Sequence, residues 1–193
     1  MQVRLSPLLF AVGAVAALTG CGDDNAFRAQ FPNRLASHTV YAMNGTPPTL
    51  PSALSVRLNN VARIDPTFGF DVAFDMDPGG GGEVRIHSTR SVAGELSPVN
   101  RVGFQFAASE FDEVTKSPGS GFKYDTAFSL PVGRTLMVDV IDGSCSGFSF
   151  LGFNIRAKLI VDSVNTTTRA IYLRMLSNPN CGFISLVEGV PKE

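Results

Sequence analysis

The chain has 193 residues, of which 44% are hydrophobic and 17% are charged, and its formal net charge is -1. This length suits one domain of ordinary size or two small ones. A nearly neutral chain has no basic surface for nucleic acid, and its apolar content excludes an intrinsically disordered protein.

The first predicted element is an export signal. Arg4 is followed by an apolar run at residues 8–18. This run is shorter than the ~20 residues that a membrane-spanning helix needs, and it has the length of a signal-peptide core. The segment Leu18-Thr19-Gly20-Cys21 follows at once and resembles the lipobox of bacterial lipoproteins. The alternative is an ordinary signal peptide with a chance cysteine after it.

The resemblance implies how the N-terminal part of the chain is processed. Residues 1–20 would be a signal peptide that is cut off, Cys21 would carry the lipid, and the polar residues 21–36 would be a tether. Several acyl chains anchor a protein stably in a bilayer. Gly22, rather than Asp, follows the cysteine. By the sorting pattern of the family, this favours the outer membrane, and we expect the domain to face the periplasm.

The sequence predicts that the remainder, residues 37–193, is a single domain built of strands. Apolar and polar residues alternate with a period of two over short segments that Gly and Pro separate, which is typical of all-β proteins. We expect strands at 39–43, 53–58, 70–77, 83–88, 102–107, 121–128, 134–141, 148–161, 168–176 and 182–188. A helical turn is expected only at 108–115. The pattern predicts an antiparallel β-sandwich of nine or ten strands, with a small β-barrel as the alternative.

The clearest hairpin joins 70–77 to 83–88 through four glycines, and it carries the densest group of carboxylates. These are Asp71, Asp75, Asp77 and Glu83. Side chains two residues apart on a strand are separated by ~7 Å, which is too wide for one cation without further ligands. We therefore expect a solvent-facing acidic surface paired with Arg85, and no metal site.

The three cysteines divide into one anchor and one pair. With Cys21 used for lipid, Cys145 and Cys181 remain, and an even pair in an oxidising compartment predicts a disulfide. Gly143-x-Cys145-x-Gly147 also has the spacing of a nucleophile elbow, but that motif needs a following helix and a His base. The segment 148–161 is not helical in pattern. Two cysteines without clustered histidines are too few for a closed metal site.

Other candidate site residues have simple structural explanations. His38 and His87 are the only histidines, and we expect both on strand surfaces rather than as a base or a ligand. Asn44 and Asn165 begin triplets that match the glycosylation pattern, and we interpret both as turns. The chain has no phosphate-binding or metalloprotease motif. We therefore assign no catalytic residue, cofactor or metal.

The expected function is a non-catalytic binding or structural role at the cell envelope. The expected partners are the membrane, through lipid on Cys21, and an envelope protein, but not nucleic acid. The alternative is a binding module for a small apolar or sugar ligand, since fifteen Phe residues are compatible with an apolar cavity. Phe153 is expected in the core, and Phe148 and Phe150 at a binding edge. A hydrolase is the least favoured class.

Overall fold

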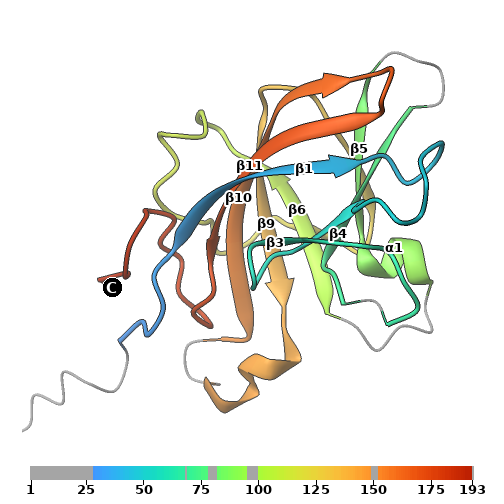
Figure 1. The fold of residues 1–193 in the computed structure, drawn as a ribbon. Coiled ribbons are helices and arrows are strands. Elements are labelled where there is room, and N and C mark those ends of the chain that lie inside the picture. The colour runs from blue at the N-terminus through green and yellow to red at the C-terminus, as the bar shows by residue number, and fades with distance from the viewer. Residues whose placement is uncertain (1–27, 68, 78–81, 95–99, 149–151, 193) are drawn as a thin grey trace, which may run out of the picture.

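The computed structural model describes residues 28–192 except 68, 78–81, 95–99 and 149–151. Cys21, the predicted signal peptide and Phe150 therefore lie outside the described residues. Two antiparallel sheets, of six and five strands, form a sandwich that does not close into a barrel (Figure 1). The predicted antiparallel β-sandwich is confirmed. No helix in the described part of the chain is long and apolar enough to cross a membrane.

The larger sheet contains the long strands. Its order is β1 (Arg34–Tyr41), β11 (Ala170–Asn178), β10 (Asn154–Asn165), β9 (Thr135–Ile141), β6 (Arg101–Phe106) and β7 (Lys123–Tyr124). The β10–β11 hairpin at its centre turns at residues 166–169, where Asn165 accepts hydrogen bonds from the amides of Thr167 and Thr168. The interpretation of Asn165 as a turn residue is thus confirmed.

The smaller sheet contains the hairpin with the four-glycine connection. Its order is β3 (Asn60–Ala62), β2 (Ala53–Ser55), β4 (Val72–Met76), β5 (Val84–Ser88) and β8 (Ala127–Leu130). In the β4–β5 pair, Phe74 lies opposite Ile86, as the alternation predicts. The described residues also contain two short helices, α1 (Thr89–Ala93) and the 3₁₀-helix η2 (Gly143–Phe148).

The main core lies between the two sheets, and two smaller clusters lie outside them. Phe74 and Phe104 are among the largest fully buried side chains of the main core. One outer cluster covers the six-stranded sheet and contains Phe111 and Leu186. The other covers the five-stranded sheet and contains Phe70. Both sheets are therefore covered on part of their outer faces, which a simple inside–outside alternation does not anticipate.

Several predicted elements differ from the observed ones. The predicted strand 121–128 is divided between β7 and β8, which belong to different sheets, and Asp125 adopts a left-handed φ of 57° between them. The predicted strand 182–188 is irregular, and Ser185 forms only an isolated bridge with Lys116. The expected helical turn at 108–115 is present as a single turn at 111–113, where the amides of Glu113 and Val114 donate to the carbonyl of Glu110. The passage of the chain from one sheet to the other and the shape of irregular loops depend on long-range contacts. Local alternation of apolar and polar residues therefore does not predict them.

Two apolar side chains of predicted strands lie at the surface, and the sequence predicts one of them, Phe153, in the core. Phe153 precedes β10 and exposes 43% of its area, and Leu58 follows the end of β2 and exposes 68%. The sandwich also begins before residue 37. Ala29 is buried and the amides of Gln30 and Phe31 donate to Asn180 Oδ1, so the described end of the predicted tether lies against the domain.

Candidate functional site

The prediction of a solvent-facing acidic surface on the β4–β5 hairpin is wrong for Asp71 and Asp75. Asp71 and Asp75 are buried, at 5% and 7% exposure, because the loops that form the outer cluster cover this face. Asp71 accepts hydrogen bonds from the Val56 amide at 2.7 Å and from Asn100 Nδ2 at 3.1 Å. Burial raises the pKa of Asp71, against the effect of these two hydrogen bonds.

Asp75 has a different set of partners. It accepts hydrogen bonds from the backbone amide and side chain of Asn44, and it forms an ion pair with Arg169 at 3.5 Å. The expected pairing with Arg85 is replaced by these contacts, although Arg85 does lie opposite Asp75 in the β4–β5 register. Asn44 lies in a turn, as its sequence context predicts.

The remaining carboxylates of the hairpin, Asp77 and Glu83, are exposed as predicted. Glu83 accepts a hydrogen bond from the Ser129 hydroxyl. Among the residues that the structure describes, no three His, Cys, Asp or Glu side chains gather as they would around a metal ion. Asp71 and Asp75 each have their own partners, so the carboxylates of this hairpin do not converge on one point.

The two histidines lie in different sheets. His38 is on β1, and its Nε2 makes a 2.8 Å hydrogen bond with Asn59 Oδ1. His87 is on β5 and is half-buried. Burial lowers the pKa of His87, and the nearby charge of Arg85 lowers it further while that of Asp75 opposes the shift. A general base needs a positioned partner, and the structure gives His38 a structural one.

Cys145 and Cys181 lie at disulfide distance, with their sulfur atoms 2.14 Å apart. The pair links η2, which follows β9, to the loop that follows β11. Cys145 is fully buried. A bonded sulfur offers no thiolate, and the thiolate is the form of cysteine that acts as a nucleophile. The arrangement agrees with the predicted disulfide rather than with a nucleophile elbow.

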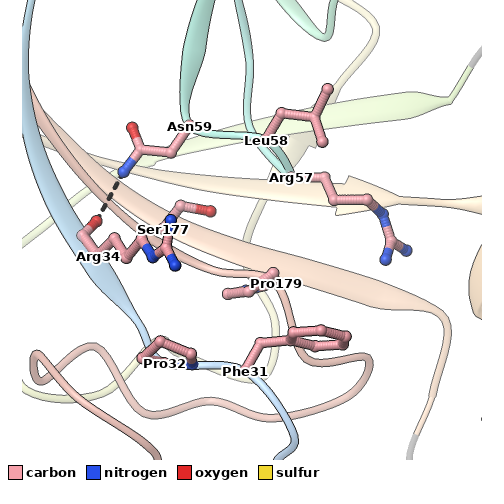
Figure 2. Close-up of a pocket in the computed structure, with 8 residues that line it drawn as sticks. All are labelled: Phe31, Pro32, Arg34, Arg57, Leu58, Asn59, Ser177 and Pro179. Atoms are coloured by element: carbon pink, nitrogen blue, oxygen red, sulfur yellow. Dashed lines mark hydrogen bonds between the residues drawn. The ribbon is translucent and has the colours of Figure 1, made fainter.

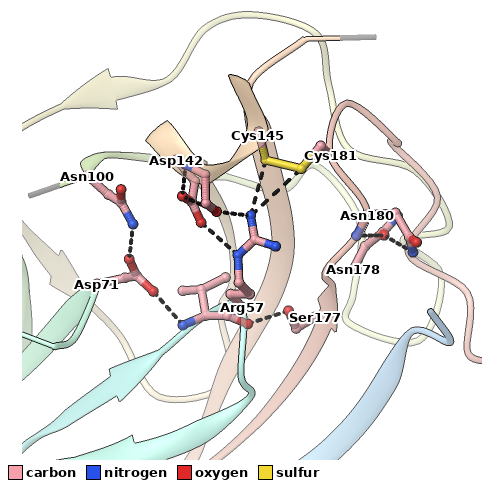
Figure 3. A network of polar contacts seen from close by, with 11 residues as sticks. Arg57, Asp71, Asn100, Asp142, Cys145, Ser177, Asn178, Asn180 and Cys181 are labelled. Atoms are coloured by element: carbon pink, nitrogen blue, oxygen red, sulfur yellow. Dashed lines mark hydrogen bonds and ion pairs between the residues drawn. A yellow bond between two sulfur atoms is a disulfide. The ribbon is translucent and has the colours of Figure 1, made fainter. Parts of the chain in front are cut away.

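Arg57 connects the disulfide to the opposite sheet. It lies in the turn 56–59 between β2 and β3, and its Nε donates to Asp142 Oδ2 at 2.8 Å. Its Nη2 donates to Ser144 Oγ at 2.7 Å and lies 3.2 Å from the sulfur of Cys145 (Figure 3). One guanidinium thus holds the β2–β3 turn against the end of β9.

Asp142 is fixed in its charged form at this junction. Burial alone would raise its pKa, but hydrogen bonds from Ser144 and Arg57 outweigh burial and lower it. The Ser144 amide and hydroxyl both donate to Asp142 Oδ1, at 2.8 and 2.7 Å. The turn, the acid and η2 therefore form a pre-organised unit rather than a set of mobile loops.

The same turn is held on its other side by Asn59. This residue adopts a left-handed φ of 49°, a conformation that Asn tolerates better than most residues. Its Nδ2 donates to the carbonyl of Arg34 at 2.7 Å. With Arg57 and Asn59 both anchored, Leu58 between them is held outward in solvent.

A groove runs between this turn and the N-terminal segment (Figure 2). It has a volume of ≈ 320 Å³ and is lined by Phe31, Pro32, Arg34, Arg57, Leu58, Asn59, Ser177 and Pro179. Phe31 exposes 54% of its area. A second hollow of ≈ 280 Å³ lies on the other side of Arg57 and Leu58, and Asp71, Asn100 and Asp142 line it. An apolar groove and an acidic hollow therefore share one fixed turn.

Sequence reasoning did not identify this groove. The sequence predicts Arg57 and Leu58 in a strand, and Phe31 in the tether. The pair Asn59-Asn60 is a weak turn signal that could have ended the predicted strand earlier, because Asn favours turns. Nothing local could have paired Arg57 with Asp142, because the two residues are 85 positions apart.

Comparisons with protein-family models, with curated proteins and with solved structures found no match to this chain. The class of the protein is therefore defined by its architecture, an antiparallel β-sandwich with a disulfide-braced groove at one end.

Proposed function

We propose that this protein is a lipid-anchored lipoprotein of the bacterial outer membrane, facing the periplasm, that binds an envelope protein and catalyses no reaction. The lipobox-like segment that ends at Cys21 supports the anchor. The groove supports the binding role, because it presents exposed apolar side chains on a frame that hydrogen bonds hold in place.

The observation that carries the binding role is the exposure of Leu58 and Phe31 on the two sides of one groove. Grouped apolar side chains on a protein surface mark interaction sites, and aromatic residues and Arg are enriched in protein interfaces. Binding of a partner here costs little conformational entropy in the turn, because Arg57 and Asn59 already hold the turn in place.

Site-specific photo-crosslinking in intact cells tests this proposal. A photoreactive residue at position 58 should give an adduct of one defined mass, whereas the same residue at exposed Val132 should not. Phe31→Ala should weaken the adduct from position 58 if the partner occupies the groove. Recovery of the monomer alone from position 58 would contradict a protein partner.

A second candidate is a small apolar or sugar ligand in the same groove. The groove volume of ≈ 320 Å³ lies at the lower end of the range of ligand pockets, about 300–1,000 Å³. Native mass spectrometry of protein isolated from the envelope would detect such a ligand as a discrete added mass. This mass should disappear in Phe31→Ala, and its absence from the wild type would exclude a ligand that survives isolation.

A further inference from the structure

The two ends of the described chain meet at one end of the sandwich. The Asn33 amide donates to the Gly189 carbonyl at 2.8 Å, and the Gly189 amide donates back at 3.1 Å. Asn33 Nδ2 also donates to the Val187 carbonyl at 2.9 Å. Figure 1 shows both segments leaving the sheets on the same side of the molecule.

A shallow hollow of ≈ 410 Å³ lies between the two segments. Arg28, Ala29, Val190, Pro191 and Lys192 line it. Val190 exposes 54% of its area and the nearby Val187 exposes 52%, although both are apolar. We call these six residues the terminal face. The face combines exposed apolar side chains with two exposed cations, and Glu188 is the acidic residue within 187–192.

We propose that the terminal face rests on the surface of the bilayer, with Val187 and Val190 in the headgroup region and Lys192 against phospholipid phosphates. The inference rests on the proposed lipidation of Cys21. Exposed apolar residues flanked by Lys and Arg are the pattern of interfacial membrane contacts.

The position of the tether selects a lipid surface over another occupant. Arg28 follows Cys21 by seven positions, and a chain of that length reaches at most ~25 Å when fully extended. Lipid on Cys21 would therefore hold the terminal face next to the bilayer at a high effective concentration. The groove opens beside this face and shares the segment that contains Phe31, so a partner protein would dock close to the membrane.

The natural chain contains no Trp, so one introduced Trp reports a single position. The mature protein isolated from the envelope is reconstituted into vesicles of phosphatidylethanolamine and phosphatidylglycerol, with and without bromine on the acyl chains. Val190→Trp should lose emission in the brominated vesicles. Val132→Trp is the matched control, because it is an exposed Val that lies before β9, away from the end of that strand that joins η2.

Each outcome decides a separate part of the proposal. Flotation with the vesicles establishes the anchor, and a protein that does not float overturns both the anchor and the terminal face. A floating protein with equal emission loss at positions 190 and 132 overturns the face and leaves the anchor. Val187→Trp is a second reporter if Val190→Trp does not fold. Lys192→Glu should reduce the emission loss of Val190→Trp. An unchanged emission loss would contradict the contact between Lys192 and the phospholipid phosphates.

Discussion

Charged side chains on the outer face of the six-stranded sheet hold a loop in place. Lys158 Nζ donates to the carbonyls of Phe111 and Val114, at 2.7 and 2.8 Å. Arg156 forms a 2.8 Å ion pair with the buried Asp139. Alternation along β10 would place these cations in solvent, but the segment that contains Phe111 covers them. Burial lowers the pKa of Lys158 as a consequence.

The buried carboxylate of Asp139 also affects the pKa of Tyr124. Burial and the hydrogen bond to Asp139 raise the pKa of Tyr124 to about 12. Asn154 Nδ2 also donates to Asp139, at 2.6 Å. Three strands, β7, β9 and β10, are thus connected through one carboxylate. Asp139 therefore has a structural role, because Tyr124, Asn154 and Arg156 all bind its carboxylate.

The first prediction concerns Lys158. Lys158→Met leaves the carbonyls of Phe111 and Val114 without this donor, and unsatisfied buried acceptors cost about 1–3 kcal/mol. We expect the free energy of unfolding in urea to fall by that amount. Lys123→Met, at an exposed position of β7, is the matched control and should change little. Equal effects of the two substitutions would contradict the role of Lys158.

The second prediction concerns pH and His87. Burial lowers its pKa below the ordinary value of 6.5, so the unfolded chain binds the proton more readily than the folded one. The contribution of neutral His87 to the free energy of unfolding is therefore fully present above pH 6.5. It decreases as the pH drops toward the pKa of His87 in the folded protein. His87→Gln should flatten this fall in urea titrations. An identical pH slope in both proteins would refute the assignment.

At the scale of elements, the ends of strands are held more firmly than their lengths suggest. β2 has only three residues, yet the turn after it is connected to β1 by Asn59 and to Ser144 of η2 by Arg57. The Cys145–Cys181 pair ties η2 to the loop after β11 in turn. The turn after β2, β1, η2 and the loop after β11 are therefore connected to one another. We expect the groove beside them to be rigid.

The third prediction concerns this pair. A sequence separation of 36 corresponds in the chain-entropy model to about 3–4 kcal/mol of stabilisation. The double variant Cys145→Ala, Cys181→Ala should lose stability of this order, and chemical reduction of the wild type should have a similar effect. Mass spectrometry under non-reducing conditions should recover the two cysteines in one linked peptide pair. Two free thiols in protein from an oxidising compartment would refute the disulfide.

At the scale of the whole molecule, the groove, the disulfide and both ends of the described chain share one end of the sandwich. Asn180 shows how they are joined, because its side chain accepts from the amides of residues 30 and 31 and it directly precedes Cys181. A lipid anchor at Cys21 would bring this end of the domain toward the membrane. The opposite end would extend away from it.

The fourth prediction concerns the anchor. Cys21→Ala removes the thiol that would receive lipid, and we expect the protein to be lost from membranes and found in the soluble fraction of the envelope. Fractionation with detection of the protein measures this. The Cys145→Ala, Cys181→Ala variant should stay with the membrane and controls for a general effect of cysteine loss. Unchanged membrane association of Cys21→Ala would refute the resemblance to a lipobox.

Local patterns along the chain were enough to predict the sandwich class and its best hairpin. In β4 and β5, alternation places Phe74 opposite Ile86, and this pattern involves only neighbouring residues. The turns at Asn44 and Asn165 were predictable for the same reason. The close approach of Cys145 and Cys181 followed from the parity of the remaining cysteines and needed no knowledge of the fold.

Only the tertiary structure decided which polar faces are buried and where the groove lies. Asp71 and Lys158 sit at alternating positions that look exposed, and distant segments cover them. Arg57 meets its partner Asp142 across 85 positions of sequence. Periodicity records which residues share a face of a strand, but it contains no information about what packs on that face, and such packing determines both burial and the shape of the groove.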